Sequence, residues 1–79
     1  MKYLICRDFA GMAVPFLFPD KVAHVDMREQ LPYSGVLSAG YAALREGRFV
    51  VWGGDGELGA QSDPNDADLL TDFFTERKN

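Results

Sequence analysis

The chain has 79 residues and a formal net charge of −4, with 47% hydrophobic and 25% charged residues. This length allows one small domain, expected over residues 1–79, which buries only about 60% of the surface that its unfolded form exposes. The composition excludes wholesale disorder and fibrous repeats. No apolar run approaches the roughly 20 residues of a membrane span, and residues 1–8 lack the features of a secretory signal. One cysteine cannot form an internal disulfide, so we expect a cytoplasmic protein.

The net charge is concentrated in the C-terminal part of the chain. Residues 1–48 contain six Lys or Arg against five Asp or Glu, a net charge of +1. Residues 49–79 contain two basic against seven acidic residues, a net charge of −5, and residues 49–76 have no Lys or Arg. This asymmetry indicates either a surface for a cationic partner or a solvated surface that keeps a small protein soluble.

The chain begins with two β-prone runs, residues 3–6 and residues 12–18. Turn-forming residues around Asp8 and Gly11 separate them, so we expect a hairpin with a loop of several residues. Pro15 removes a donor from the ladder, which places the second strand at an edge or at a bulge.

A short helix is predicted over residues 24–30, and Pro32 prevents it from continuing. Two further strands are predicted over residues 35–44 and 48–52, joined as a hairpin by a three- or four-residue loop that contains glycine. Gly40 lies in the middle of the first of these strands. It indicates a bulge or the close approach of another element.

Residues 53–60 contain four glycines and are expected to be mostly loop, with a short returning strand over residues 57–61. A second helix is predicted to begin directly after these residues. Ser62 or Asp63 can cap a helix, and Pro64 suits its first turn because the missing donor is not needed there.

The C-terminal helix is predicted to be amphipathic. Ala67, Leu70 and Phe74 fall at i, i+3 and i+7 and form an apolar stripe. The order of elements therefore predicts an α+β fold, a small antiparallel sheet of hairpins with a short middle helix and a C-terminal amphipathic helix packed on one face.

The polar side of the C-terminal helix would carry an acidic ridge. Asp68, Asp72 and Glu76 lie at i, i+4 and i+8, and like charges at this spacing slightly destabilise an isolated helix. We therefore expect these carboxylates to point outward, without neutralising partners in the chain, toward a cationic protein. The predicted partner-binding residues are Asp55, Glu57, Asp63, Asp66, Asp68, Asp72 and Glu76.

Motifs that would carry catalysis or ligand binding are weak. Residues 54–59 match G-x-G-x-x-G, but no helix is predicted to begin there and Asp55 and Glu57 would repel phosphates. A glycine-rich turn between two strands is expected instead. His24 is the only histidine and is expected to be structural, and too few Cys and His are present for a soft-metal site. We expect no enzyme activity, no catalytic residue, no metal and no cofactor, and no direct nucleic-acid binding because a basic stripe is missing.

Short motifs are distributed over most of the chain. They are Leu17-Phe18-Pro19-Asp20, His24 with Asp26, Val36-Leu37-Ser38-Ala39-Gly40, Leu58-Gly59, Ser62, and Pro64-Asn65-Asp66-Ala67. This pattern resembles a group of small proteins from phages and prophages. The resemblance implies a mobile-element origin, and small acidic phage proteins include many inhibitors of host defence, among them anti-CRISPR proteins that imitate DNA. It implies no catalytic residue.

Two functions are therefore expected. The first is an anti-CRISPR-like inhibitor, in the cytoplasm of a host bacterium, that binds a basic DNA-recognising surface of a CRISPR surveillance complex and blocks target DNA as a DNA mimic. The alternative is a phage protein–protein interaction or homodimeric assembly module whose acidity serves only solubility. Its contacts would come from Phe16, Phe18, Tyr41 or Trp52. The sequence leaves the choice between monomer and homodimer open.

Overall fold

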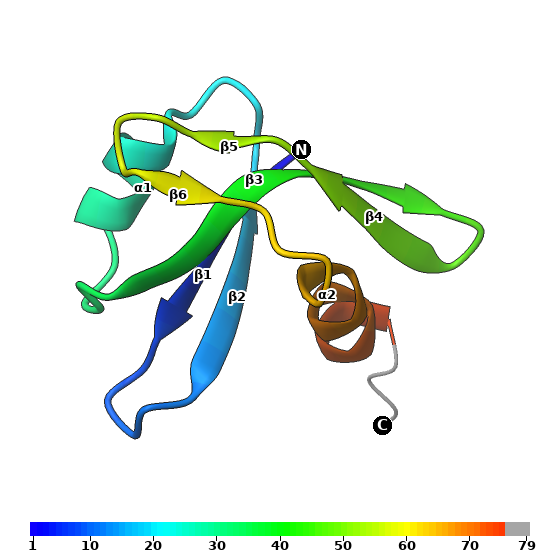
Figure 1. The fold of residues 1–79 in the computed structure, drawn as a ribbon, viewed down its shortest axis with the longest axis horizontal. Helices are drawn as coiled ribbons and strands as arrows, with labels where there is room; N and C mark the ends of the chain where they lie inside the picture. The colour runs from blue at the N-terminus through cyan, green and yellow to red at the C-terminus, as the bar shows by residue number, and fades with distance from the viewer. Residues whose placement is uncertain (76–79) are drawn as a thin grey trace.

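The computed structural model of the protein describes residues 1–75. Its main element is a four-stranded antiparallel sheet with the strand order β2-β1-β3-β4 (Figure 1). The strands are β1 (Lys2–Arg7), β2 (Ala13–Phe18), β3 (Val36–Arg45) and β4 (Arg48–Trp52). Both predicted hairpins are confirmed. Pro15 lies in the edge strand β2, in agreement with its missing backbone donor.

The long strand β3 takes part in two separate pairings. Its first part, up to Tyr41, pairs with β1, and its last part, from Tyr41 to Arg45, pairs with β4. The β3–β4 hairpin therefore extends past the end of β1 (Figure 1). Only Glu46 and Gly47 form its loop, with φ values of 51° and 82°, so the expectation of three or four residues was wrong. Two residues in this left-handed region match the twist of the flanking strands.

Two helices and a short ribbon complete the fold. The helices are α1 (His24–Glu29) and α2 (Asp66–Thr75), and the ribbon pairs β5 (Gly54–Asp55) with β6 (Ala60–Gln61). The G-x-G-x-x-G segment is thus a glycine-rich turn between two strands, as predicted. The α+β class is confirmed.

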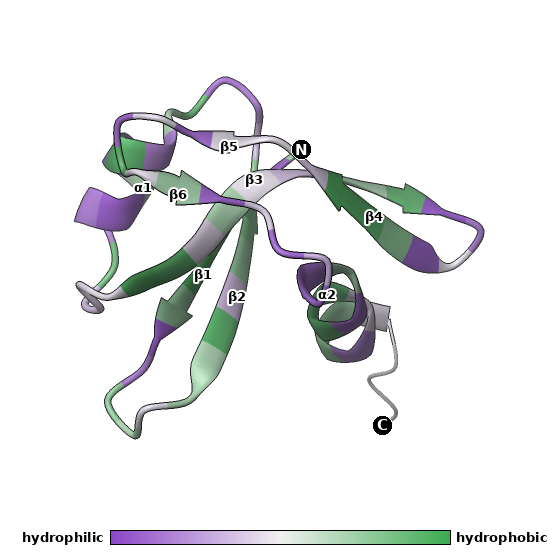
Figure 2. Cartoon of the chain, viewed as in Figure 1, coloured by the Kyte–Doolittle hydropathy of each residue, from purple (hydrophilic) through white to green (hydrophobic). Residues whose placement is uncertain are grey.

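Both faces of the central strand β1 are buried. Tyr3 and Ile5 pack with Leu70 of α2 on one face, whereas Leu4 and Cys6 pack with residues of α1 on the other. Figure 2 shows the matching alternation of apolar and polar residues around α2. A strand with two buried faces has no polar alternation, which explains the continuous apolar run in β1.

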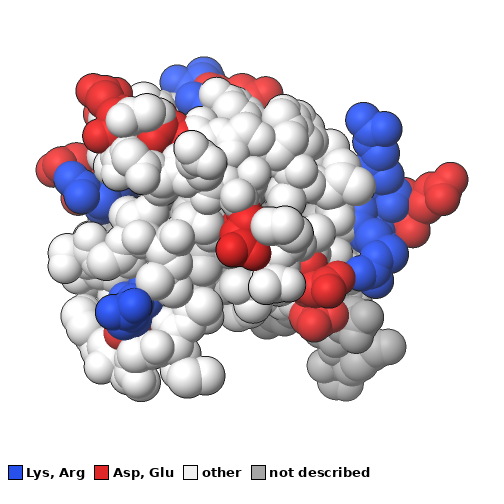
Figure 3. Space-filling view, in the orientation of Figure 1, with Lys and Arg blue, Asp and Glu red and all other residues white. Residues whose placement is uncertain are grey.

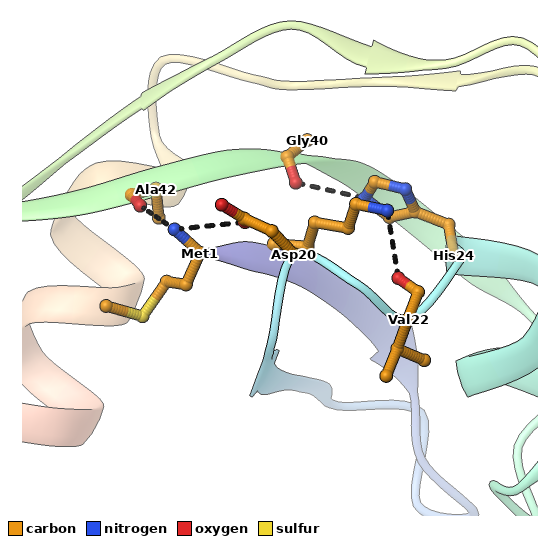
Figure 4. A network of polar contacts seen from close by, with 7 residues as sticks. Met1, Asp20, Val22, His24, Gly40 and Ala42 are labelled. Atoms are coloured by element: carbon orange, nitrogen blue, oxygen red, sulfur yellow. Dashed lines mark hydrogen bonds and ion pairs between the residues drawn. The ribbon is translucent and has the colours of Figure 1, made fainter.

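Gly40 lies where β3 is crowded from both sides. A Cβ atom at this position would lie 2.6 Å from the carbonyl oxygen of Trp52 and 3.3 Å from Cε2 of Tyr3. The predicted close approach is therefore confirmed. The Gly40 carbonyl also accepts a hydrogen bond from Nε2 of His24 at 3.0 Å (Figure 4), and His24 is buried. The histidine thus connects α1 to β3.

Further polar contacts connect the first residues to the segment before α1 (Figure 4). The amino group of Met1 donates to the carbonyl oxygen of Ala42 at 2.9 Å and lies 3.4 Å from Oδ1 of Asp20. The ammonium of Lys2 donates to the carbonyl oxygen of Val22 at 2.9 Å. These contacts hold the connection between β2 and α1 against the sheet.

Candidate functional site

Asp66, one of the predicted contact residues, points into the protein. Its side chain is only 6% exposed, and its Oδ2 accepts hydrogen bonds from the Tyr3 hydroxyl at 2.6 Å and from the Asp63 N–H at 2.9 Å. The expectation of an outward carboxylate is therefore wrong here. The physical reason is that α2 begins directly over Tyr3 of β1, so the first helical turn faces the sheet.

Two more of the predicted contact residues are matched within the chain. Oδ1 of Asp68 accepts a hydrogen bond from the Arg48 guanidinium at 2.7 Å. Oδ1 of Asp55 lies 3.4 Å from Nδ1 of His24, and its Oδ2 accepts from the Leu58 N–H at 3.0 Å. The expectation of unneutralised carboxylates is therefore wrong at these two positions, because Arg48 and His24, both from residues 1–48, reach them.

The remaining predicted contact residues within residues 1–75 lie on separate elements. Glu57, Asp63 and Asp72 are exposed, and none of them forms an ion pair with a residue in the described range 1–75. They belong to the β5–β6 turn, the segment before α2, and α2. Glu76 lies outside the described residues. Figure 3 shows acidic side chains dispersed over the visible face, with basic side chains beside several of them.

Asp63 and Asp66 form a reciprocal capping arrangement at the start of α2. Oδ1 of Asp63 accepts from the Asn65 N–H at 2.9 Å, while Asp66 accepts from the Asp63 N–H. Pro64 lies between them, where no donor is required. The predicted helix start is confirmed. In residues 1–75, the second oxygen of each carboxylate, Oδ2 of Asp63 and Oδ1 of Asp66, accepts no hydrogen bond.

A pocket of about 280 Å³ opens beside these two carboxylates. Its apolar part is formed by Ile5, Ala13, Leu37 and Leu69. Its polar part is formed by Ser38, Asp63, Asn65 and Asp66. We call these eight residues the bulge pocket. It is the place where the structure brings two predicted contact residues together.

A β-bulge in β3 shapes this pocket. Ile5 pairs with Ser38, whereas Cys6 pairs with Val36, so Leu37 has no partner in β1. An extra residue in one strand interrupts the regular alternation of side chains. Leu37, which is 44% exposed, and Ser38, which is 5% exposed, therefore both line the same pocket. Sequence analysis missed these two residues because it placed the irregularity of this strand at Gly40.

The Ser38 hydroxyl is a polar group without a partner inside the described chain. Buried hydroxyls normally form hydrogen bonds, yet Ser38 forms none through its side chain with residues 1–75. Within the same residues, every buried side-chain nitrogen or oxygen that is shielded from solvent has a partner. Oγ of Ser38 therefore keeps some exposure to solvent, and Ser38 is one of the residues that line the bulge pocket.

A larger hollow of about 450 Å³ follows the β5–β6 ribbon, but it offers less chemistry. Its lining consists mainly of glycines, and both oxygens of Asp55 already face partners. In the described part of the chain, no group of three or more His, Cys, Asp or Glu is placed to hold a metal ion. The helices of that part are too short or too polar to cross a membrane.

The exposed aromatic side chains of residues 1–75 are Phe9 in the β1–β2 loop, which is 82% exposed, Trp52 on the β3–β4 hairpin and Phe73 on α2. Trp52 is 48% exposed and stacks on Tyr41, with ring centroids 6.2 Å apart, and Val50 beside it is also exposed. Of the other predicted aromatic contacts, Phe18 is buried and Phe16 is half-buried. Of the predicted aromatic contacts, Trp52 is therefore the most exposed, and Tyr41 is half-buried beside it.

No protein-family model, curated protein or solved structure matches this chain.

Proposed function

We propose that the protein is a non-enzymatic inhibitor of the anti-CRISPR type, which binds a basic, DNA-recognising protein surface and excludes DNA from it. The supporting observation is the carboxylate pair of Asp63 and Asp66, which has two oxygens without partners in residues 1–75 and lies beside a pocket. Exposed Glu57 and Asp72 add negative charge on neighbouring elements. A cationic surface attracts such a domain, and the bound domain then occludes the DNA site.

The proposed contact does not use the full acidic ridge that the sequence predicted along the C-terminal helix. Oδ1 of Asp68 is paired with Arg48, and both oxygens of Asp55 face partners, so these two carboxylates carry less unpaired charge than Glu57 and Asp72. The imitation of DNA then consists of long-range attraction and steric exclusion rather than a copied phosphate spacing. Attraction of this kind raises the association rate more than it slows dissociation.

The test is charge reversal at two exposed positions whose side chains make no ion pair in residues 1–75. The variant with Glu57→Lys and Asp72→Lys should inhibit DNA binding by a CRISPR surveillance complex less well, through slower association. Rising salt should reduce the difference in association rate between parent and variant, because it screens the attraction that only the parent retains. The matched control carries Asp26→Lys and Glu29→Lys on α1, which is the same change in charge on another element. Equal inhibition by the parent and the first variant, or equal losses in both variants, would refute the proposal.

A second candidate function is a homodimeric assembly module, favoured by the exposed Trp52 and Val50 on the β3–β4 hairpin. Paired aromatic surfaces supply contact area at low entropic cost. Light scattering should then report a dimer that Trp52→Ser disrupts. Leu44→Ser, at a residue of the same hairpin that is 53% exposed, is the control and should leave the dimer intact. A monomer at all concentrations would exclude this candidate.

A further inference from the structure

We propose that the bulge pocket binds the ammonium group of a lysine side chain from the protein partner. The inference rests on the proposed function, because it names the group that the basic partner presents. It depends on an observation other than acidity, namely that Ser38, which is only 5% exposed, lines the pocket and forms no side-chain hydrogen bond with residues 1–75.

The polar side chains of the pocket offer acceptors for an ammonium. Oγ of Ser38, Oδ1 of Asp66 and Oδ2 of Asp63 are three acceptors without hydrogen bonds in residues 1–75. An ammonium has three donors and no acceptor. No lysine or arginine lines the pocket, so the described chain supplies no cation of its own. A positive charge from outside is therefore the group that satisfies these atoms.

The apolar side of the pocket matches the rest of a lysine side chain. Ile5 and Leu69 line the pocket, and Leu37, which also lines it, is 44% exposed at the bulge. Lysine carries four methylene groups, which pack along apolar surface while the charged end reaches polar atoms. The apolar lining residues thus suit the stem, and the polar lining residues suit the charge.

The geometry favours lysine over arginine. Oδ2 of Asp66 is occupied by Tyr3 and Asp63, and Oδ1 of Asp63 is occupied by Asn65. Oδ2 of Asp66 has both of its lone pairs in use and Oδ1 of Asp63 has one in use, so neither carboxylate offers two oxygens that are both without hydrogen bonds. The strong mode of arginine binding needs both oxygens of one carboxylate for two parallel hydrogen bonds. An ammonium acts as a compact charge and needs only one oxygen from each group.

The test uses N-acetyl-lysine methylamide as the probe, followed by NMR of the ¹⁵N-labelled protein. We expect saturable shifts of backbone amides confined to the bulge pocket, at Ser38, Asn65, Asp66 and Leu69. The arginine analogue should bind several-fold more weakly, and the Nε-acetylated lysine analogue about tenfold more weakly or not at all, because acetylation removes the charge and leaves one donor. Equal shifts with all three probes, or shifts outside the pocket, would overturn the inference.

Variants assign the binding to the pocket. Ser38→Ala and Asp63→Asn should each weaken the lysine probe about threefold to tenfold. Asp26→Asn removes the same charge from an exposed residue of α1, outside the pocket, and should leave binding unchanged. Unchanged binding in both pocket variants would also overturn the inference. If the Glu57→Lys, Asp72→Lys variant loses inhibition but the parent protein does not bind the lysine probe, the proposed function stands and only the pocket is refuted. If the parent protein binds the probe but that variant inhibits as well as the parent, the pocket stands and the proposed function is refuted.

Discussion

Replacing Tyr3 by phenylalanine removes one hydroxyl from the contact between β1 and the start of α2. Tyr3 is 0% exposed, and its hydroxyl donates to Oδ2 of Asp66 at 2.6 Å. Asp66 is 6% exposed, so the variant leaves a carboxylate oxygen in a nearly dry position with only the Asp63 N–H as donor. Hydrogen bonds to charged groups contribute about 1.5–3 kcal/mol.

This loss is large for a domain of this size. A domain of 60–100 residues changes its melting temperature by about 4–8 °C for each kcal/mol, so Tyr3→Phe should lower Tm by about 6–24 °C. The assay is thermal and urea unfolding followed by circular dichroism. Tyr33→Phe is the control, because the Tyr33 hydroxyl forms no hydrogen bond with residues 1–75, and its effect should remain within about 0.5 kcal/mol.

A double-mutant cycle identifies the interaction. Tyr3→Phe, Asp66→Asn and the combined variant should give a coupling free energy of about 1 kcal/mol or more, because the two side chains touch. Additive losses would show that the hydroxyl and the carboxylate act separately. That result, or a loss for Tyr3→Phe no larger than for Tyr33→Phe, would refute the energetic role assigned to this contact.

Three further changes follow from the same structure. Burial, together with the hydrogen bond to Asp66, raises the pKa of Tyr3, so above about pH 10 the unfolded chain releases a proton that the folded chain retains. The free energy of unfolding should then fall by up to about 1.4 kcal/mol per pH unit. Denaturant titrations of the Tyr3→Phe variant should lack this fall. Gly40→Ala should cost about 1–3 kcal/mol, because its Cβ would lie 2.6 Å from the Trp52 carbonyl oxygen, whereas Gly56→Ala, with nothing within 4 Å, should be nearly neutral in the same melts. Glu46→Asn should raise stability by about 0.5 kcal/mol or more, since asparagine tolerates the left-handed conformation better than glutamate and Glu46 has a φ of 51°; an unchanged or lower Tm would contradict this.

The elements of the fold could be predicted because their signals are local. Pro15 placed β2 at an edge, and Asp63 with Pro64 marked the start of α2 within four residues. The β3–β4 loop was predicted too long, because a glutamate is an unusual residue for the first position of a two-residue left-handed turn. The bulge at Leu37 gave no local signal, since it is a mismatch of register with β1 rather than a property of its own segment.

The amino-acid sequence by itself determined the α+β class, the two hairpins, the amphipathic α2 and its capped start, because hydrophobic periodicity and turn chemistry act between residues a few positions apart. Only the tertiary structure decided which carboxylates are available to a partner. Asp66 meets Tyr3, which lies 63 positions away, and Asp68 meets Arg48, 20 positions away. The direction in which a carboxylate points, and the cation or hydroxyl that it meets, depends on how β1, β4 and α2 pack together. The separation of the acidic residues into buried, paired and free groups is therefore a property of the folded chain.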